Sequence, residues 1–149
     1  MKGKIIFLSI FLMLSTEMVS SQAKNAPQSI ISTTALIRKY HDQKELKGMQ
    51  KGELLELYIE RIKVLVKTLP YIALATKPGV TMADLGIPMD SENKKIQDAQ
   101  VSSTNSFLDV TVEFQRKMMP YSDKDNLVAA ILFYENTLKT LHLFNESNE

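Results

Sequence analysis

KGELLELYIERIKVLVKTL, residues 51–69, is the stretch that decides the fold. Its apolar side chains recur every three or four residues, the spacing of one face of an α-helix. This face comprises Leu54, Leu55, Tyr58, Ile62, Leu65, Val66 and Leu69. Leu57, Ile59 and Val64 widen it, so we expect a central helix that packs against more than one neighbour. The side facing solvent is predicted to carry most of the charged residues Glu53, Glu56, Glu60, Arg61, Lys63 and Lys67.

Pro70 directly follows this segment and removes one backbone donor. The helix must therefore end or kink there. Because residues 71–75 remain apolar, we favour a kink with continuation to Ala75.

Residues 75–88, ATKPGVTMADLGIP, break the helical pattern. Pro78-Gly79 indicates a turn, Thr81 can cap a short helical turn, and Gly86 suits its left-handed end. We weigh two interpretations, a structural clasp that buries its own apolar residues, which we favour, and a loop that docks a partner. The candidate docking residues are Lys77, Val80, Met82, Asp84, Leu85 and Ile87.

Two further long helices are predicted downstream. The first is capped by Asp90 or Ser91 and runs over residues 92–119, and its predicted inner stripe is Ile96, Ala99, Ser103, Phe107, Val110, Phe114 and Met118. Pro120 ends it, and Ser122 with Asp125 resembles a capping box that begins a last helix over residues 123–144. The inner face of that helix is predicted to hold Leu127, Ala130, Ile131, Tyr134, Leu138, Leu141 and His142.

The segment before residue 51 has a weaker pattern. Residues 24–32 are polar and contain a proline, which favours a flexible leader. Residues 33–50 hold one or two short helices, one of them capped by Asp42 and running through Leu46, or pack as a fourth helix. The predicted fold is all-α, a small antiparallel helical bundle of three long helices plus one or two short N-terminal ones, over residues 33–145. We expect residues 146–149 to fray.

The N-terminus has the layout of a secretory signal peptide. Lys2 and Lys4 precede an apolar run over residues 5–14 and a small, polar tail. The run is too short to cross a hydrocarbon core of about 30 Å as a helix. We predict a signal peptide over residues 1–23, cleaved after Ala23 or Ser21, and no stable transmembrane anchor after cleavage. The expected location is periplasmic or extracellular, with an uncleaved anchor as the alternative.

Charge and cysteine content exclude several classes of protein. Residues 1–23 carry two of the 18 basic and one of the 17 acidic residues, so the processed chain has no net charge. Nucleic acid is therefore not an expected partner, since its phosphates need a basic surface. The chain contains no cysteine, which excludes disulfides, thiolate nucleophiles, cysteine metal sites and cysteine lipid anchors. A secreted domain without disulfides fits a bacterial envelope.

The residues also argue against catalysis. The two histidines, His41 and His142, are too far apart in sequence for a usual zinc site. Arg38 and Lys139 stand three residues before them, so the Glu-x-x-His pairs of a di-iron bundle are absent. There is no G-x-S-x-G motif and no glycine-rich phosphate loop. We expect no enzyme activity, no metal and no resident cofactor.

These observations lead to two functional hypotheses. The first is a non-catalytic interaction protein that contacts another envelope or secreted protein through the 75–90 loop or an exposed helix stripe. The alternative is a bundle that binds a small molecule, b-type haem in its most specific form, with Met49 and His142 as ligands.

Overall fold

The computed structural model describes residues 27–146, apart from the side chains of His142 and residues 144–146. The predicted signal peptide, residues 1–23, lies outside the described residues, as do residues 147–149 of the predicted tail. Within residues 27–146, no helix has the length and apolar content needed to cross a membrane.

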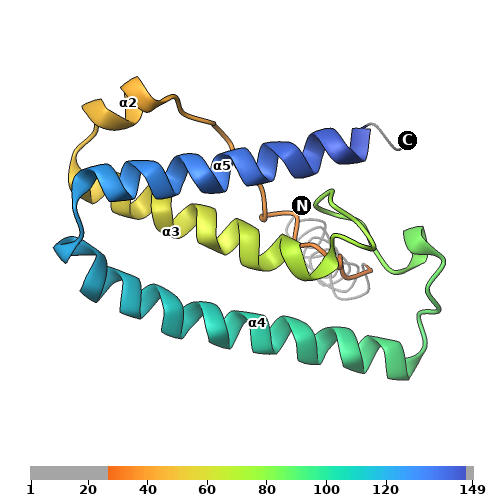
Figure 1. Ribbon diagram of the computed structural model, residues 1–149. Coiled ribbons are helices and arrows are strands. Elements are labelled where there is room, and N and C mark those ends of the chain that lie inside the picture. The colour runs from red at the N-terminus through yellow and green to blue at the C-terminus, as the bar shows by residue number, and fades with distance from the viewer. Residues whose placement is uncertain (1–26, 147–149) are drawn as a thin grey trace, which may run out of the picture.

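The fold is all-α, as predicted, with three long helices and one short N-terminal helix (Figure 1). The α-helices are α2 (Gln43–Gly48), α3 (Lys51–Thr68), α4 (Ser91–Met118) and α5 (Lys124–Glu146). Three single 3₁₀ turns accompany them, η1 (Leu69–Tyr71), η2 (Ala83–Leu85) and η3 (Met119–Tyr121). The described residues contain no β-strand, only one isolated bridge between Ser29 and Thr81.

Helix α3 lies between the other two long helices and packs against both, as its wide apolar face predicts. Helix α4 runs opposite to α3, and α5 returns in the direction of α3 (Figure 1). Near the start of α3, helix α2 covers α5 and completes a core cluster. The buried members of this cluster are Leu46, Leu54, Leu127, Val128 and Ile131.

Residues 33–42 are here called the strap. A fourth helix was one alternative predicted for this part of the chain. The strap contains no helix and leads to α2. Its Ile37 packs against the buried residues Val64, Leu65 and Leu138, which belong to α3 and α5. Asp42 caps α2 in a capping box with Glu45, as predicted. The strap therefore packs against α3 and α5 as a non-helical segment and not as a fourth helix.

The prediction of a flexible leader is wrong for residues 29–31. Ile30 donates its N–H to the Val80 carbonyl at 2.8 Å, and Ile31 accepts from the Gly79 N–H at 2.9 Å. Ile31 is fully buried. The prediction was based on the polar composition of residues 24–32. It did not account for Ile30 and Ile31, whose apolar partners lie about fifty residues further along the chain.

The 75–88 loop supplies those partners. Met82 is buried with Ile30, Ile31 and Ala35, and the half-buried residues Tyr71, Ala75, Leu85 and Ile87 pack against this cluster. Gly79 has φ 92° and Gly86 has φ 69°, backbone conformations that favour glycine. The structure thus has the clasp that we favoured.

The predicted kink at Pro70 is wrong. The α-helix ends at Thr68 and the chain continues as η1 and a turn instead of a helix to Ala75. Pro70 cannot donate to the helical ladder, and the Leu74 N–H bonds the Tyr71 carbonyl at 2.7 Å. The apolar residues after Pro70 did not indicate a buried helix, because Ile72 and Leu74 are exposed.

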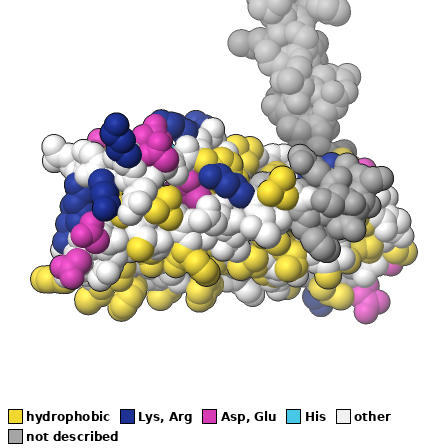
Figure 2. Space-filling view, turned by 45° about the horizontal axis from the view of Figure 1, so that its top comes forward, with side chains coloured by type: hydrophobic (Ala, Val, Ile, Leu, Met, Phe, Trp, Pro, Cys, Tyr) yellow, Lys and Arg dark blue, Asp and Glu magenta, His cyan; other side chains and the backbone are white. Residues whose placement is uncertain are grey.

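The predicted orientation of α4 is also wrong. All seven residues of the predicted inner stripe are exposed. The buried residues of α4 are Leu108 and Gln115, and Val101 on the same side is half-buried. Figure 2 shows hydrophobic side chains along the lower edge of the molecule, where α4 lies in Figure 1. Helical periodicity groups residues on one face, but it does not say what covers that face.

We predict that Ile31→Ala lowers the free energy of unfolding by about 2–5 kcal/mol, because it leaves a cavity in the clasp cluster. Leu36→Ala, at a side chain that is 44% exposed, is the matched control and should change stability little. Chemical denaturation followed by circular dichroism measures both. Equal, small losses would mean that residues 29–31 are the loose leader first expected.

Candidate functional site

The side chain of Arg61 is buried, contrary to its predicted place on the solvent-facing side of α3. It is 1% exposed, as is its partner Glu135 on α5. Arg61 is therefore directed into the interface between the two helices. A signal for this was present, because Glu135 falls between Ile131 and Leu138 on the inner face of the last helix.

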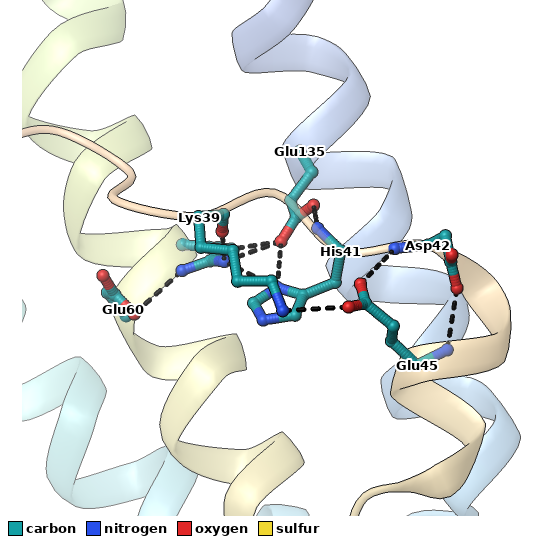
Figure 3. Close-up of polar contacts among 7 residues, drawn as sticks. Lys39, His41, Asp42, Glu45, Glu60 and Glu135 are labelled. Carbon is teal, nitrogen blue, oxygen red and sulfur yellow. Dashed lines mark hydrogen bonds and ion pairs between the residues drawn. The ribbon is translucent and has the colours of Figure 1, made fainter.

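All three guanidinium nitrogens of Arg61 donate hydrogen bonds in this interface, and Figure 3 labels the partners Lys39, Glu60 and Glu135. Its Nε and Nη2 donate to Glu135 Oε1 at 3.0 and 2.7 Å. Nη2 also donates to the Lys39 carbonyl of the strap at 2.7 Å, and Nη1 donates to Glu60 Oε2 at 2.8 Å. The charge of Arg61 is thus compensated on each side, which a buried ion needs.

Glu135 also holds the strap directly. Its Oε2 accepts the backbone N–H of His41 at 2.7 Å. The ring Nδ1 of His41 lies 3.2 Å from Glu135 Oε1 and 3.2 Å from Arg61 Nη2. Both carboxylate oxygens are therefore occupied by structural partners. The cluster of Arg61, Glu135 and His41 joins α3, α5 and the strap, and is here called the lock. Among the described hydrogen bonds of His41, none involves the hydroxyl of a serine or threonine that the histidine could activate as a nucleophile.

An open cavity of about 650 Å³ lies beside this lock, between the strap and α3. The charged residues of its lining are mostly cationic, with Arg38, Lys39, Arg61, Lys63 and Lys67 against one carboxylate, Glu60. An anionic group suits such a lining. Arg61 already binds Glu135, however, and Lys39 binds Glu45 at 2.9 Å, so the remaining positive charges stand on long surface side chains.

The six candidate residues of the 75–88 loop do not form one exposed surface. Met82 is buried, Val80, Leu85 and Ile87 are half-buried, and only Lys77 and Asp84 are exposed. Asp84 Oδ2 accepts from both the N–H and the hydroxyl of Thr81, at 2.8 and 2.7 Å. These bonds hold the pKa of Asp84 below its usual value. The docking role of this loop stays a prediction.

The largest exposed apolar feature of a single helix is instead the α4 face, defined as Ile96, Phe107, Val110, Phe114 and Met118. These side chains are 62, 56, 71, 58 and 46% exposed. Tyr121 of η3 follows at the C-terminal end and is 87% exposed. Sequence analysis found this stripe but assigned it to the core. The covered side of α4 carries the polar residues Thr104, Thr111 and Gln115, so no pattern in the sequence indicated that the stripe faces outward.

The two residues named as haem ligands in the alternative hypothesis do not come together. Met49 packs beside Leu127, Val128 and Ile131, near the start of α5. Residue 142 lies eleven positions beyond Ile131 on the same helix, which corresponds to roughly 16 Å. One iron cannot bind both, so haem binding would need other ligands. The described residues hold no cluster of three or more histidine, aspartate or glutamate side chains suited to a metal ion.

Comparison with known proteins yields no match to a family model, a curated protein or a solved structure.

We predict that Glu135→Ala lowers the free energy of unfolding by about 3–5 kcal/mol, because it leaves Arg61 buried without its counter-ion. Glu56→Ala is the matched control. It breaks the exposed pair of Glu56 with Arg116, whose Oε1–Nη1 distance is 2.6 Å, and should cost about 0–1 kcal/mol.

Urea denaturation measures both variants. Replacing the pair together, as Arg61→Met with Glu135→Leu, should recover much of the loss, since neither charge then stays buried alone. A Glu135→Ala variant no less stable than Glu56→Ala would contradict the lock.

A second pair of side chains joins α3 and α5. The rings of Tyr58 and Tyr134 lie 5.6 Å apart. Burial and a hydrogen bond with Tyr58 raise the pKa of Tyr134 to about 12, from a usual value of 10.0. The folded protein therefore favours the neutral phenol of Tyr134.

We predict that the stabilisation linked to Tyr134 is complete below pH 10 and is lost as the pH rises toward about 12, because unfolding releases this proton more easily. Ultraviolet absorbance of the phenolate should show a late titration step from Tyr134, in addition to that of Tyr40, whose pKa is also raised by burial and by Glu135. Tyr134→Phe should remove that step, and Tyr58→Phe should move it to lower pH. A titration without a late step would refute the prediction.

Proposed function

We propose that this chain is a non-catalytic interaction protein of the bacterial envelope or exterior, and that the α4 face is its binding surface. The observation that carries the proposal is the exposure of five large apolar side chains along one helix. Exposed apolar residues scattered singly over a surface are ordinary, whereas a contiguous patch marks a binding surface.

The size of the α4 face fits this role. Phe107, Phe114 and Tyr121 are 56, 58 and 87% exposed, so at about 150–250 Å² for a whole aromatic side chain they offer on the order of 300–500 Å². That is already the size of the largest apolar patch on a typical monomer, roughly 300–600 Å². Ile96, Val110 and Met118 add to this area, and a standard protein–protein interface takes roughly 800 Å² from each partner.

The spacing of the α4 face points to the chemistry of the partner. Phe107, Val110 and Phe114 repeat at three and four residues, the pattern with which one amphipathic helix packs against another. The partner surface is therefore an apolar helical face of a protein. Nucleic acid is not supported, because the processed chain carries no net charge.

Two further observations support a role without catalysis. The lock residues Arg61, Glu135 and His41 bind one another and the strap, so they are engaged in holding the fold. Of the seven exposed residues of the α4 stripe, Ser103 alone has a polar side chain.

In-cell photo-cross-linking tests the proposal. We expect a photoreactive amino acid in place of Val110 to give a discrete cross-linked protein, identified by mass spectrometry, because Val110 is the most exposed member of the α4 face. The same group in place of Phe133, which is 66% exposed on α5, is the control and should give none. Absence of any protein adduct from Val110, Phe107 and Phe114 would refute the proposal.

A further inference from the structure

We infer that the open cavity between the strap and α3 is a binding site for a small organic anion, a phosphate or carboxylate group that carries an apolar chain. This inference goes beyond the proposed function, because it assigns a small-molecule ligand to a second place on the molecule. It does not depend on the α4 face.

The positive charges that line the cavity are only partly balanced. Lys39 is paired with Glu45, and Arg61 is paired with Glu135. Glu60, the carboxylate of the lining, accepts from Arg61 Nη1 at 2.8 Å and is engaged as well. The remaining cations of the lining have no such partner within residues 27–146. They are Arg38, Lys63 and Lys67.

Helix α3 places two of these cations next to each other. Lys63 and Lys67 are four residues apart, so they lie on the same side of the helix, where like charges repel each other. Lys67 is half-buried, which reduces the screening of its charge by salt. An anion bound between the two ammonium groups would remove this repulsion.

The strap supplies the third cation. Arg38 belongs to the strap and lines the same cavity as the two lysines of α3. A guanidinium can donate two parallel hydrogen bonds to one phosphate or carboxylate group. Cations from both walls of the cavity can therefore bind one anionic group.

The lock holds these two walls in place. The Lys39 carbonyl accepts from Arg61 Nη2 at 2.7 Å, and the His41 N–H donates to Glu135 Oε2 at 2.7 Å. A site whose walls are fixed before the ligand arrives loses less conformational entropy on binding. The volume of about 650 Å³ lies within the roughly 300–1,000 Å³ that is usual for small-molecule sites.

The rest of the lining favours an organic anion over an inorganic one. Leu36 of the strap and Leu57 of α3 both line the cavity beside the cations. The side chain of Leu36 is 44% exposed. An alkyl chain placed against it would remove apolar surface of both partners from water, which favours binding.

Isothermal titration calorimetry of the full chain with hexyl phosphate tests the inference, at an ionic strength fixed with sodium chloride. The wild type should bind hexyl phosphate, and its thermal unfolding should shift to higher temperature, because a ligand of the folded state stabilises that state. Lys63→Gln combined with Lys67→Gln should weaken binding by about tenfold or more, since two charged donors are lost.

The matched control is Lys94→Gln combined with Lys95→Gln. It removes the same charge at two exposed residues of α4 and should bind hexyl phosphate as the wild type does. If the Lys63→Gln, Lys67→Gln variant does not fold, Arg38→Gln provides the same comparison at an exposed residue of the strap.

Two further measurements test the apolar part of the ligand. Inorganic phosphate should bind the wild type more weakly than hexyl phosphate. Leu36→Ala should weaken the binding of hexyl phosphate by about threefold and leave that of inorganic phosphate unchanged. Equal affinities of the two phosphates would overturn the assignment of an organic anion.

A lipid headgroup could present the same chemistry, and sedimentation with vesicles of equal parts phosphatidylcholine and phosphatidic acid distinguishes this source. The protein should stay in the supernatant, because the ligand enters between the strap and α3 as a single molecule. Sedimentation that the Lys63→Gln, Lys67→Gln variant loses would overturn the small-molecule assignment in favour of a membrane.

Two results would overturn the site itself. The first is a wild type that binds hexyl phosphate no better than the Lys63→Gln, Lys67→Gln variant, and the second is equal loss in the Lys94→Gln, Lys95→Gln control. Neither result bears on the cross-linking of Val110, so the α4 face and the cavity can fail separately.

Discussion

The buried ion pair of Arg61 and Glu135 is the interaction on which the rest of the structure depends. Two parallel helices, α3 and α5, meet around it, and the strap is attached through the Lys39 carbonyl and the His41 N–H. A buried pair of this kind need not add net stability, because desolvation of both ions opposes their attraction. It does fix geometry. Only one rotation of each helix and one path of the strap satisfy every donor and acceptor.

That geometry explains why α4 keeps an apolar surface. The strap and α2 complete the core on the α5 side, so the core of α3 is largely closed before α4 is added. Helix α4 then packs on the remaining side of α3 through Leu108 and Gln115, and its stripe of large apolar residues is left over. The candidate binding surface is thus the side of α4 that no other described element covers.

The sequence was informative wherever a pattern had a local cause. Periodicity placed the three long helices, and Asp42, Asp90 and the two turn glycines marked boundaries that the structure confirms. Three features depend on residues far apart in sequence, and local patterns did not show which residues come together. Ile31 pairs with the clasp, Arg61 pairs with Glu135, and the stripe of α4 lacks a covering element within the described chain. The 75–88 loop packs against residues 30–35, its docking role stays a prediction, and the face assigned to the core became the candidate site.

The polar inner side of α4 has a consequence for local opening. Gln115 is buried there, and Oε1 of its side chain accepts no hydrogen bond from the described residues, whereas α3 and α5 share an extensive apolar and ionic contact. We therefore expect that separating α4 from α3 requires less free energy than separating α3 from α5. The amides of α4 should exchange with solvent at a lower opening energy than those of the helix pair. Any partner that binds α4 would raise the free energy of its local opening. Binding would therefore make α4 more rigid.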